Sequence, residues 1–477
     1  MVVHIKVVLA IPDFPKESEA PKYIIKESKS RPGTAPLGLL TMIAYLEKNG
    51  VEMELIDNFV LRLPSQEFAK RIAEMRPSLV GFSTNSFTYP QGRNNMKDLK
   101  ELLPDVPVVV GGVHATLFPM EVANEPFVDY VCRGEGEQTL LELVQALERD
   151  ETPENVKGIV FRKKDGTLHV SEERPFMNLD DLPLPDRHIK NFKDYTRGKV
   201  TYMNVEPIDM ISSSRGCPFN CNFCSSKTLW KRSYRVRSVK NVVDEIEELI
   251  NVYGSKGLYF REDNFTVNRQ RTMELCAEIT RRGIRIPWVC ESRVDLLSEE
   301  LLVAMKAAGC KGIWFGVESG SQKILDYVNK GIKLEDVEKC IKLCKKHGVK
   351  TGASFIMGLP NETKEDVQKS FEFAKKLNCD STWFNQFIGM PNCKIYMEIK
   401  EGKYYIDDWN GLLAVQTPYF TFEELLDIET KINSYFKVKR WKSLMLVTKP
   451  TKLIGNLPGI AKMVKTALFD PPFKKEL

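Results

Sequence analysis

The stretch Ser214-Arg215-Gly216-Cys217-Pro218-Phe219-Asn220-Cys221-Asn222-Phe223-Cys224 carries three cysteines in the spacing C-x-x-x-C-x-x-C. It follows an apolar run at residues 208–211, so we expect it to form a loop after a strand. Gly and Pro between and before the cysteines allow the chain to turn tightly, and three thiols on such a loop can bind one metal centre. Three thiols leave one coordination position unfilled.

Two kinds of metal centre fit three closely spaced cysteines. An iron–sulfur cube is usually held by four thiolates, so three thiolates leave one iron open to another ligand. A structural zinc site needs a fourth Cys or His at short spacing, and none follows within the next fifty residues. The iron–sulfur interpretation is therefore favoured, with zinc or a purely structural role as the alternative.

The cysteine spacing, the aromatic Phe223 before the last cysteine and the strand–loop context resemble the radical SAM superfamily. This resemblance implies that Cys217, Cys221 and Cys224 hold a 4Fe–4S cluster whose open iron binds S-adenosylmethionine. It also implies cleavage of that molecule to a 5'-deoxyadenosyl radical. The electron would come from an external one-electron donor of the flavodoxin or ferredoxin type.

Length and composition indicate a globular chain with two or three domains. It has 477 residues, of which 43% are hydrophobic and 28% charged. It contains no apolar run long enough to span a bilayer as a helix and no signal-peptide start. We therefore expect a cytoplasmic protein whose eleven cysteines are thiols and metal ligands rather than disulfides.

The net charge of +5 is unevenly distributed, because residues 431–477 contain eleven Lys and Arg but two Asp and Glu. Such a basic tail is usually a solvated face, and peripheral contact with an anionic membrane is the alternative. No recognition motif accompanies the charge, so we expect no nucleic-acid partner.

Residues 5–136 alternate short β-branched runs with segments of helical spacing. This order predicts an N-terminal Rossmann-like (flavodoxin-like) parallel sheet with helices on both faces. The expected strands are residues 5–11, 51–56, 79–83, 107–110 and 130–132, and the expected helices are 37–48, 65–75 and 91–102.

Ligands bind such sheets beyond the carboxyl ends of the strands. The loops expected there are residues 83–90, 111–114 and 133–137, which are rich in hydroxyl side chains and glycine. No G-x-G-x-x-G opens a helix, which argues against a dinucleotide.

The segments GGVHAT at 111–116 and RGEGE at 133–137 resemble the cobalamin-binding domain of cobalamin-dependent radical SAM enzymes. The resemblance implies cobalamin contacts from Ser83, Thr84, Gly111, Gly112, His114, Glu135 and Gly136. No D-x-H-x-x-G is present, so it also implies a cobalt whose lower face is open or weakly ligated. His114 is the nearest candidate to touch the corrin, although a loop histidine more often packs or donates a hydrogen bond. A flavodoxin-like module without a ligand is the alternative.

Residues 208–390 return to alternating strands and helices and predict a partial (β/α)6 barrel. The expected strands are residues 208–212, 257–262, 288–291, 312–317, 352–357 and 382–387, and the expected helices are 242–252, 271–282, 299–308, 334–347 and 364–377. Between the two domains, residues 156–177 predict a hairpin with its turn at 164–167, and the prolines of 182–186 predict a linker.

Polar residues follow the expected barrel strands, where S-adenosylmethionine would need partners for its ammonium, carboxylate and ribose. The resemblance assigns Glu262 and Asp263 to the ammonium, Arg293 to the carboxylate, and Glu318 or Ser319 to the ribose or methionine part. The backbone near Phe223 and Ile356 would meet the adenine. For each of these residues, an ion pair at the barrel rim is the alternative.

The four expected regions are a cobalamin-binding domain at 1–150, a hairpin and linker at 151–200, a radical SAM barrel at 201–392 and a C-terminal region at 393–477. The last resembles the small, mostly α-helical domain that caps the barrel mouth in this subgroup. The eight cysteines outside the motif have no spacing that indicates a second cluster. The sequence identifies no catalytic residue for proton or hydrogen-atom transfer.

The resemblance therefore implies a cobalamin-dependent radical SAM methyltransferase that methylates an unactivated sp3 carbon by way of methylcobalamin and the adenosyl radical. The first alternative keeps both cofactors but closes a ring, oxidises or rearranges the substrate. The second, from another class, is a cobalamin- or cluster-binding sensor without turnover. We expect a monomer acting on a small-molecule, lipid or peptide substrate, which the sequence does not name.

Overall fold

The computed structural model describes residues 5–16, 19–21, 35–188, 195 and 205–445. The chain divides into two compact units. The first takes in the chain up to Gly198 together with Arg235–Ser238 and Trp409–Leu412, and the second takes in the remainder.

The first unit is built on a seven-stranded sheet with the strand order β2-β1-β3-β4-β5-β6-β7. The first five strands in sequence pair in parallel, as predicted, and β6 and β7 add to β5 as an antiparallel hairpin. The strands are β1 (Lys6–Ile11), β2 (Glu52–Asp57), β3 (Leu79–Ser83), β4 (Val108–Gly111), β5 (Tyr130–Cys132), β6 (Ile159–Arg162) and β7 (Leu168–Val170). The hairpin predicted at 156–177 is thus confirmed, and Gly166 takes the left-handed conformation in its turn.

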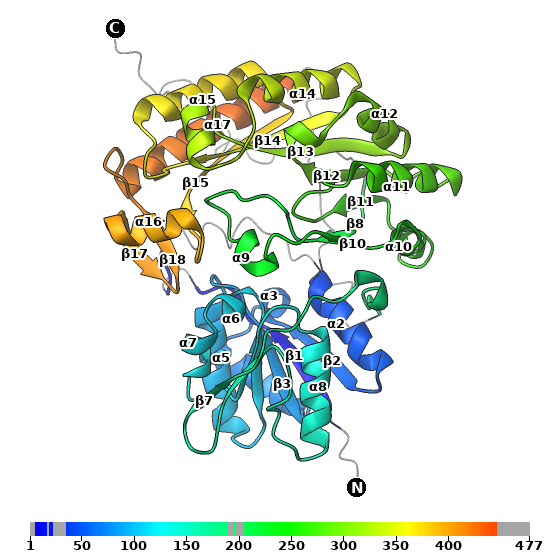
Figure 1. Ribbon diagram of the computed structural model, residues 1–477, viewed down its shortest axis with the longest axis vertical. Coiled ribbons are helices and arrows are strands. Elements are labelled where there is room, and N and C mark those ends of the chain that lie inside the picture. The colour runs from blue at the N-terminus through cyan, green and yellow to red at the C-terminus, as the bar shows by residue number, and fades with distance from the viewer. Residues whose placement is uncertain (1–4, 17–18, 22–34, 189–194, 196–204, 446–477) are drawn as a thin grey trace. The chain divides into compact units, whose positions relative to one another are not determined.

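Helices cover both faces of this sheet because successive strand residues point to opposite sides. Val8 and Val80 pack against α4 and α5, whereas Val7 and Leu79 pack against α2 and α8. The fold of this unit can be followed in Figure 1, where its helices are coloured blue to cyan. They are α2 (Leu37–Lys48), α3 (Asn58–Leu61), α4 (Ser65–Glu74), α5 (Tyr89–Leu102), α6 (Val113–Leu117), α7 (Pro119–Ala123) and α8 (Glu137–Glu148), and a short 3-10 turn spans Leu179–Asp181.

The second unit contains a six-stranded parallel sheet in the order β15-β14-β13-β12-β11-β8, which confirms the predicted partial barrel. Its strands are β8 (Ile208–Ile211), β11 (Gly257–Phe260), β12 (Trp288–Ser292), β13 (Cys310–Glu318), β14 (Lys350–Met357) and β15 (Ser381–Gln386). The order is sequential, so each β/α unit lies beside the previous one.

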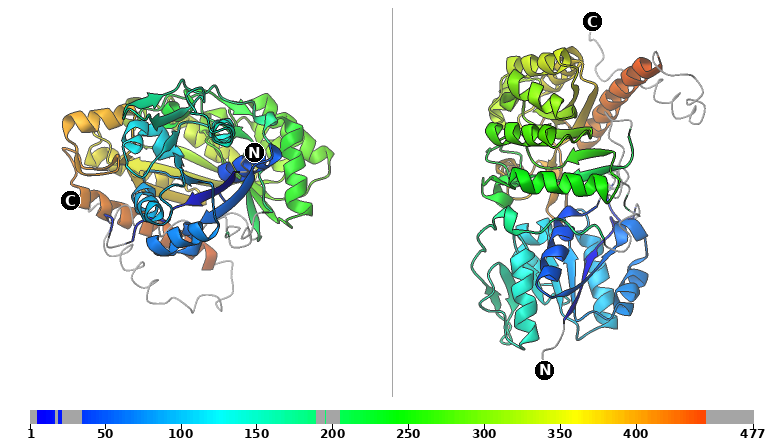
Figure 2. Two further views of the ribbon diagram at one scale, coloured as in Figure 1. Left: turned by 90° about the horizontal axis from the view of Figure 1, so that it is seen from below. Right: turned by 90° about the vertical axis from the view of Figure 1, so that its right-hand side faces the viewer.

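The barrel helices lie along one side of this curved sheet, visible as stacked green and yellow coils in the right-hand view of Figure 2. They are α10 (Val239–Asn251), α11 (Arg269–Arg281), α12 (Glu299–Ala307), α13 (Gln322–Tyr327), α14 (Leu334–Lys346) and α15 (Lys364–Leu377), with a 3-10 turn at Val294–Leu296. Side-chain caps fix where several begin. Ser298 accepts the N–H of Leu301 at the start of α12, and Thr363 and Asp366 form a reciprocal capping box on α15.

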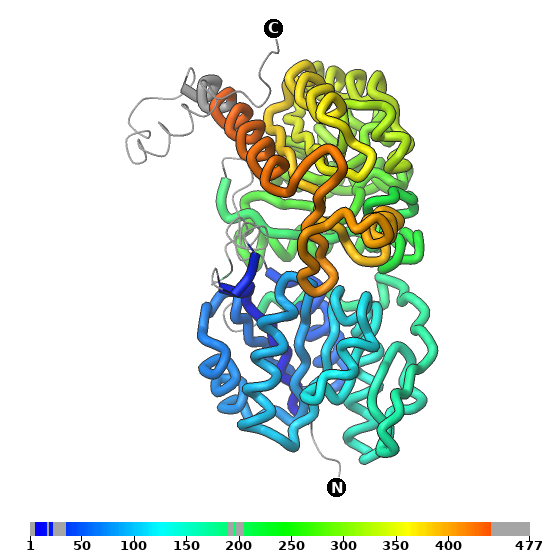
Figure 3. Tube along the Cα trace, turned by 90° about the vertical axis from the view of Figure 1, so that its left-hand side faces the viewer, coloured from blue at the N-terminus to red at the C-terminus, as the bar shows by residue number. Residues whose placement is uncertain are grey.

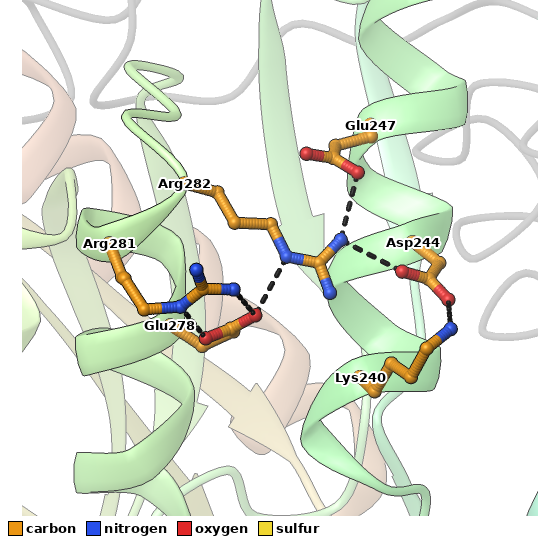
Figure 4. Close-up of polar contacts among 6 residues, drawn as sticks. All are labelled: Lys240, Asp244, Glu247, Glu278, Arg281 and Arg282. Carbon is orange, nitrogen blue, oxygen red and sulfur yellow. Dashed lines mark hydrogen bonds and ion pairs between the residues drawn. The ribbon is translucent and has the colours of Figure 1, made fainter.

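Arg282 ties two neighbouring barrel helices together by ion pairs (Figure 4). Its guanidinium lies 2.8 Å from Asp244 and 2.8 Å from Glu247, both on α10, and 2.8 Å from Glu278 on α11. Arg281 pairs with the same Glu278 at 2.7 Å. One cation therefore connects α10 to α11.

The region after the barrel contains α16 (Lys394–Gly402), α17 (Phe422–Met445) and a three-stranded sheet of order β16-β18-β17 that the sequence did not predict. The sheet strands are β16 (Ile388–Gly389), β17 (Tyr405–Trp409) and β18 (Leu412–Val415). α17, orange to red in Figure 3, packs on β15, and its Asn433 accepts the N–H of Phe384 at 2.9 Å and donates to the Phe384 carbonyl at 2.7 Å. The predicted basic tail begins within α17, and its part from residue 446 on, including Lys449, lies outside the described residues, so membrane contact through it stays a prediction.

Within the described ranges, no helix combines the length and the apolarity needed to cross a bilayer.

Candidate functional site

The cysteine loop follows β8 and β9 (Ser214–Arg215) and continues to α9 (Ser226–Trp230). Its entry depends on Gly216, which has a φ of +91° and whose Cβ, if present, would lie 2.3 Å from the carbonyl oxygen of Ser233. Only glycine fits this close approach without strain. Gly216 therefore sets the direction in which the three cysteines leave the strand.

Hydrogen bonds connect this loop to the end of α13 and to the residues that follow it. Asn222 donates from its backbone N to Val328 O and from Nδ2 to Tyr327 O, both at 2.8 Å. Asn329 Nδ2 donates to Asn220 O, also at 2.8 Å. Hydrogen bonds of the backbone and of asparagine side chains thus hold the loop in place, and none of these bonds involves a thiol.

Cys217, Cys221 and Cys224 are partly buried and lie within electrostatic range of one another. Burial raises the pKa of the Cys217 thiol, and it raises the pKa of Cys224 to about 12. Within the described residues, no three His, Cys, Asp or Glu side chains close around one point tightly enough to hold a single metal ion. Three cysteine ligands fit an iron–sulfur cluster with one open iron better than a structural zinc site, which takes four protein ligands.

Arg293, at the end of β12, lies directly against the cysteine loop. Its guanidinium stacks on the ring of Phe219, 3.8 Å from the ring centroid, and its Nη1 lies 3.9 Å from Cys221 Sγ. The same side chain forms a two-point ion pair with Asp295 at 3.0 Å. Much of its hydrogen-bonding capacity is therefore used inside the protein, and its role toward a carboxylate stays a prediction.

Glu262 and Asp263 follow β11, beside the same loop. Glu262 accepts hydrogen bonds from the hydroxyls of Ser213, at 2.7 Å, and Ser214, and burial raises its pKa. Asp263 accepts from Ser226 Oγ at 3.1 Å, and the backbone N–H of Ser226 points to Cys224 Sγ at 3.4 Å. Asp263 is exposed, and Ser226 contacts both Asp263 and Cys224. The Asp263 carboxylate is therefore near the thiols and accessible to a ligand bound at the cluster.

The end of β13 carries Glu318 and Ser319, which the structure places in different surroundings. Glu318 has a φ of +68°, a left-handed conformation that costs about 1–2 kcal/mol for a residue with a side chain. Its carboxylate pairs with Lys330 at 2.7 Å. Ser319 is fully buried and its hydroxyl contacts Ser370 Oγ at 3.0 Å and the N–H of Ser321 at 3.1 Å. Ser319 thus has a packing role, whereas Glu318 is held in a strained position.

Phe223 and Ile356 pack against one apolar cluster that includes Ile324, Leu359 and Phe387. Ile356 lies near the carboxyl end of β14 and Phe223 lies on the cysteine loop. The structure therefore brings together two residues that are distant in sequence and were predicted to flank the same adenine.

The loops after β3 and β4 meet in the first unit at the carboxyl edge of its sheet. Thr84 N donates to Gly111 O at 3.0 Å, and His114 N donates to Thr84 O at 3.2 Å. Gly112 has a φ of +93°, and a Cβ there would lie 2.4 Å from Thr84 O. Ser83, Thr84, Gly111 and Gly112 are thus assembled into one closed double loop, at the place where sheets of this kind bind ligands.

His114 lies in the first turn of α6, directly after this double loop, and not in a loop as the sequence predicted. It is 4% exposed, its ring stacks on Tyr89 with centroids 3.9 Å apart, and Nδ1 lies 3.0 Å from Ser86 Oγ. Burial lowers the pKa of His114 to about 4. Its neutral, packed ring agrees with the packing role that the sequence favours over ligation of cobalt.

Glu135 and Gly136 lie in the loop that connects β5 to α8 in the first unit. Glu135 forms a two-point ion pair with Arg235 at 2.7 and 3.0 Å and accepts the N–H of Met177 at 3.3 Å. Gly136 lies close to Met42, since a Cβ there would be 2.6 Å from Met42 Cε. Gly134, two residues earlier, has a φ of +74° and open space around it, so the backbone at this edge is accessible to a flat ligand. The arrangement fits cobalamin, although each contact remains a prediction.

Lys330, Phe219 and Ser213 contact the predicted site residues but were not identified from the sequence. Lys330 sits in Asn329-Lys330-Gly331, which resembles an ordinary turn, and no local pattern marks its pairing with Glu318. Phe219 lies between two cysteines of the motif, and its aromatic ring was the one sequence feature that could have indicated a contact with a cation such as Arg293.

Comparisons with known proteins agree with both sites. The family described as the radical SAM superfamily matches residues 211–374, and the family described as the B12 binding domain matches residues 29–144. The first range includes the cysteine loop and the four barrel strands β11 to β14, and the second includes the double loop after β3 and β4.

Individual relatives extend over most of the chain. An uncharacterized methyltransferase from Pyrococcus horikoshii is 34% identical over 363 residues, which cover 76% of this chain and 77% of the relative. The anaerobic magnesium-protoporphyrin IX monomethyl ester cyclase of Rubrivivax gelatinosus is 30% identical and covers 80% of this chain and 70% of its own. The solved structure of TsrM, a radical S-adenosylmethionine methyltransferase from Kitasatospora setae, shares the fold with a TM-score of 0.69 at 21% identity, over 84% of this chain and 75% of that chain.

A cobalamin-binding sheet joined to a partial barrel with a three-cysteine loop defines a class of radical enzyme. The chain belongs to the cobalamin-dependent radical SAM family. Its cofactors are accordingly a 4Fe–4S cluster, S-adenosylmethionine and cobalamin, and the reaction class that its relatives support best is methyl transfer.

Proposed function

We propose that this enzyme transfers a methyl group to an unactivated sp3 carbon. The observation that carries the proposal is the presence in one chain of both sites: the braced three-cysteine loop of the second unit and the glycine-closed double loop of the first. An sp3 carbon has no lone pair with which to attack a sulfonium, so its hydrogen must be removed before a methyl group is added. When bound, the cluster and cobalamin supply the electron and the methyl group for these two operations.

The residues of this chain would position the cofactors rather than react. Cys217, Cys221 and Cys224 would hold the cluster. Asp263 and Glu318 would accept hydrogen bonds from S-adenosylmethionine, with Phe223 and Ile356 beside its adenine. Ser83, Thr84, Gly111 and Gly112 would line the corrin, with His114 and Glu135 supporting the loops from inside.

The partners follow from this chemistry. A reductant must deliver single electrons, which we propose is a flavodoxin or ferredoxin, and a reducing compartment such as the cytoplasm would preserve the thiols. The substrate would be a small molecule, with a lipid or a peptide side chain as the other forms, and the protein would act as a monomer.

The cyclase relative favours a second candidate, in which the same cofactors close a ring or oxidise the substrate without methyl transfer. A sensor without turnover is the third. The three differ in what happens to the methyl group and to the adenosyl part of S-adenosylmethionine.

The test uses anaerobically reconstituted full-length protein with trideuteromethyl-labelled S-adenosylmethionine, cobalamin and a chemical reductant. Methyl transfer predicts labelled methylcobalamin, detected by mass spectrometry, together with 5'-deoxyadenosine. Deoxyadenosine without labelled cobalamin would support the second candidate, and neither product would support a sensor. Cys217→Ala should abolish both products, whereas Cys379→Ala, a cysteine outside the motif, should leave them unchanged.

A further inference from the structure

The end of β13 is held by a buried ion pair between Glu318 and Lys330. Lys330 Nζ donates to Glu318 Oε1 at 2.7 Å, and the side chains of Lys330 and Glu318 are 8% and 10% exposed. Gly316 makes room for the pair, because a Cβ at that position would lie 2.4 Å from Glu318 Oε1 and 3.0 Å from Lys330 Nζ. A buried charge is stable only with its partner in place, so each of these side chains fixes the position of the other.

The pair also holds a strained backbone. Glu318 has a left-handed φ of +68°, and the pairing register between β13 and β14 shifts between Gly316 and Glu318. A residue with a side chain keeps this conformation only where its surroundings fix it, and such residues gather at binding sites. The Glu318 carboxylate forms its ion pair with the Lys330 ammonium, so this pair helps to hold Glu318 in its left-handed conformation.

Lys330 reaches the cysteine loop as well. Its carbonyl accepts Arg293 Nη2 at 2.7 Å, and Arg293 stacks on Phe219 beside Cys221. Its ammonium lies 5.9 Å from the ring centroid of Phe223. One buried residue is therefore in contact with the strand-end carboxylate, with the arginine under the loop and with the aromatic residue of the motif.

We propose that Lys330 is a positioning residue that sets Glu318 for the ribose of S-adenosylmethionine and aligns it with the cysteine loop. The proposal rests on the nucleotide site proposed above, in which Glu318 contacts that ligand. Lys330 itself does not touch a reacting atom. Its side chain acts through Glu318, and its backbone carbonyl acts through Arg293.

The test measures S-adenosylmethionine binding rather than turnover. Reconstituted full-length protein is compared with Lys330→Met, Lys330→Arg, Glu318→Gln and the double variant Glu318→Gln/Lys330→Met. Lys339→Met is the matched control, since Lys339 is 78% exposed on α14. Iron content, the dissociation constant for S-adenosylmethionine by equilibrium dialysis and the thermal midpoint are measured for each.

We expect Lys330→Met to keep its iron but to bind S-adenosylmethionine at least about tenfold more weakly, with partial recovery in Lys330→Arg. It should also unfold at a lower temperature, because it leaves the Glu318 carboxylate buried without its cation. The double variant removes that unpaired charge, so it should regain thermal stability while its binding stays weak. Lys339→Met should match the wild type in all three measurements.

Two results would overturn the proposal. Wild-type affinity in Lys330→Met would show that Glu318 does not need Lys330, and recovery of both stability and affinity in the double variant would show a purely structural role. A wild-type protein that binds S-adenosylmethionine but fails to label cobalamin would count against methyl transfer and leave the role of Lys330 intact. The two failures are thus distinguishable.

Discussion

Glu362 Oε2 accepts the backbone N–H of Gly358 at 2.6 Å, across the turn that ends β14. The N–H of Leu359 adds a second bond at 3.3 Å, while Oε1 is buried with no hydrogen-bond partner among the described residues. Burial raises the pKa of Glu362 to about 8, even though the two N–H donors favour the charged form. This carboxyl is therefore protonated in the folded enzyme at neutral pH.

Glu362→Gln tests that assignment through stability. Between pH 4.5, the ordinary pKa of a glutamate, and pH 8, the unfolded chain has lost the Glu362 proton and the folded chain keeps it. Wild-type stability should therefore decrease as pH rises through this window. The Gln variant lacks this loss, so its free energy of unfolding relative to wild type should rise by on the order of 1–3 kcal/mol from pH 5 to pH 8.

Urea unfolding of the apo protein at both pH values measures this difference. Glu365→Gln is the matched control, because Glu365 lies in the first turn of α15, three residues after Glu362, and its side chain is 74% exposed. A difference between Glu362→Gln and wild type that does not change with pH would mean that Glu362 is ionised in the folded protein.

Gly112→Ala should damage the first unit more than another glycine substitution with the same backbone strain. Gly112 has a φ of +93° and its Cβ would meet Thr84 O at 2.4 Å, whereas Gly50 has a φ of +84° and open space. We expect a loss of about 1 kcal/mol for Gly50→Ala and about 2 kcal/mol or more for Gly112→Ala. Thermal unfolding gives the stabilities and gel filtration with added cobalamin gives retention, which should fall in Gly112→Ala alone. Equal effects of the two substitutions would contradict the packed double loop.

His114→Phe should change the pH dependence of stability without changing the visible spectrum of bound cobalamin. Burial lowers the pKa of His114 from 6.5 to about 4. Between these pH values the His114 ring is protonated in the unfolded chain and neutral in the folded chain. Wild-type stability should fall as pH decreases from 6.5 to 4, and the Phe variant should lose this dependence. Chemical unfolding at the two pH values, with spectra at pH 7.5, provides the measurement. A spectral shift in the variant would instead indicate that His114 ligates the cobalt.

Arg282→Met should loosen the contact between α10 and α11. The substitution removes one cation from three carboxylates, so we expect a loss of about 1 kcal/mol at low salt. The loss should shrink in 1 M NaCl because salt screens exposed ion pairs. Arg281→Met, which loses contact with Glu278 alone, is the control and should cost less; an equal cost in both variants would show that the bridge to α10 adds nothing.

The strand and helix order could be read from the sequence where apolar periodicity was strong. α2 and α15 occupy the predicted residues 37–48 and 364–377, and all eleven predicted parallel strands form. Helix α8 was missed because Gly136, and no Ser, Thr, Asp or Asn, precedes it, and its cap forms no side-chain hydrogen bond. The three-stranded sheet after the barrel was missed because β16 is two residues long.

The candidate site was predictable where residues are close in sequence and less so where they meet through the fold. The three cysteines and the glycine loops carry local motifs. The partners of the predicted acids do not: Glu135 meets Arg235 and Glu318 meets Lys330 through contacts that only folding creates. Because those pairs set which carboxylates are free for a ligand, the roles of individual acids could not be ranked from the sequence.

The central claim is that three thiolates hold a cluster with one iron open to S-adenosylmethionine. Electron paramagnetic resonance of the reduced, anaerobically reconstituted protein, recorded with and without S-adenosylmethionine, tests it most directly. The account predicts a 4Fe–4S signal whose g values shift when the ligand is added, and no such signal in Cys221→Ala. A signal unchanged by S-adenosylmethionine, or zinc in place of iron in the protein as isolated without oxygen, would contradict it.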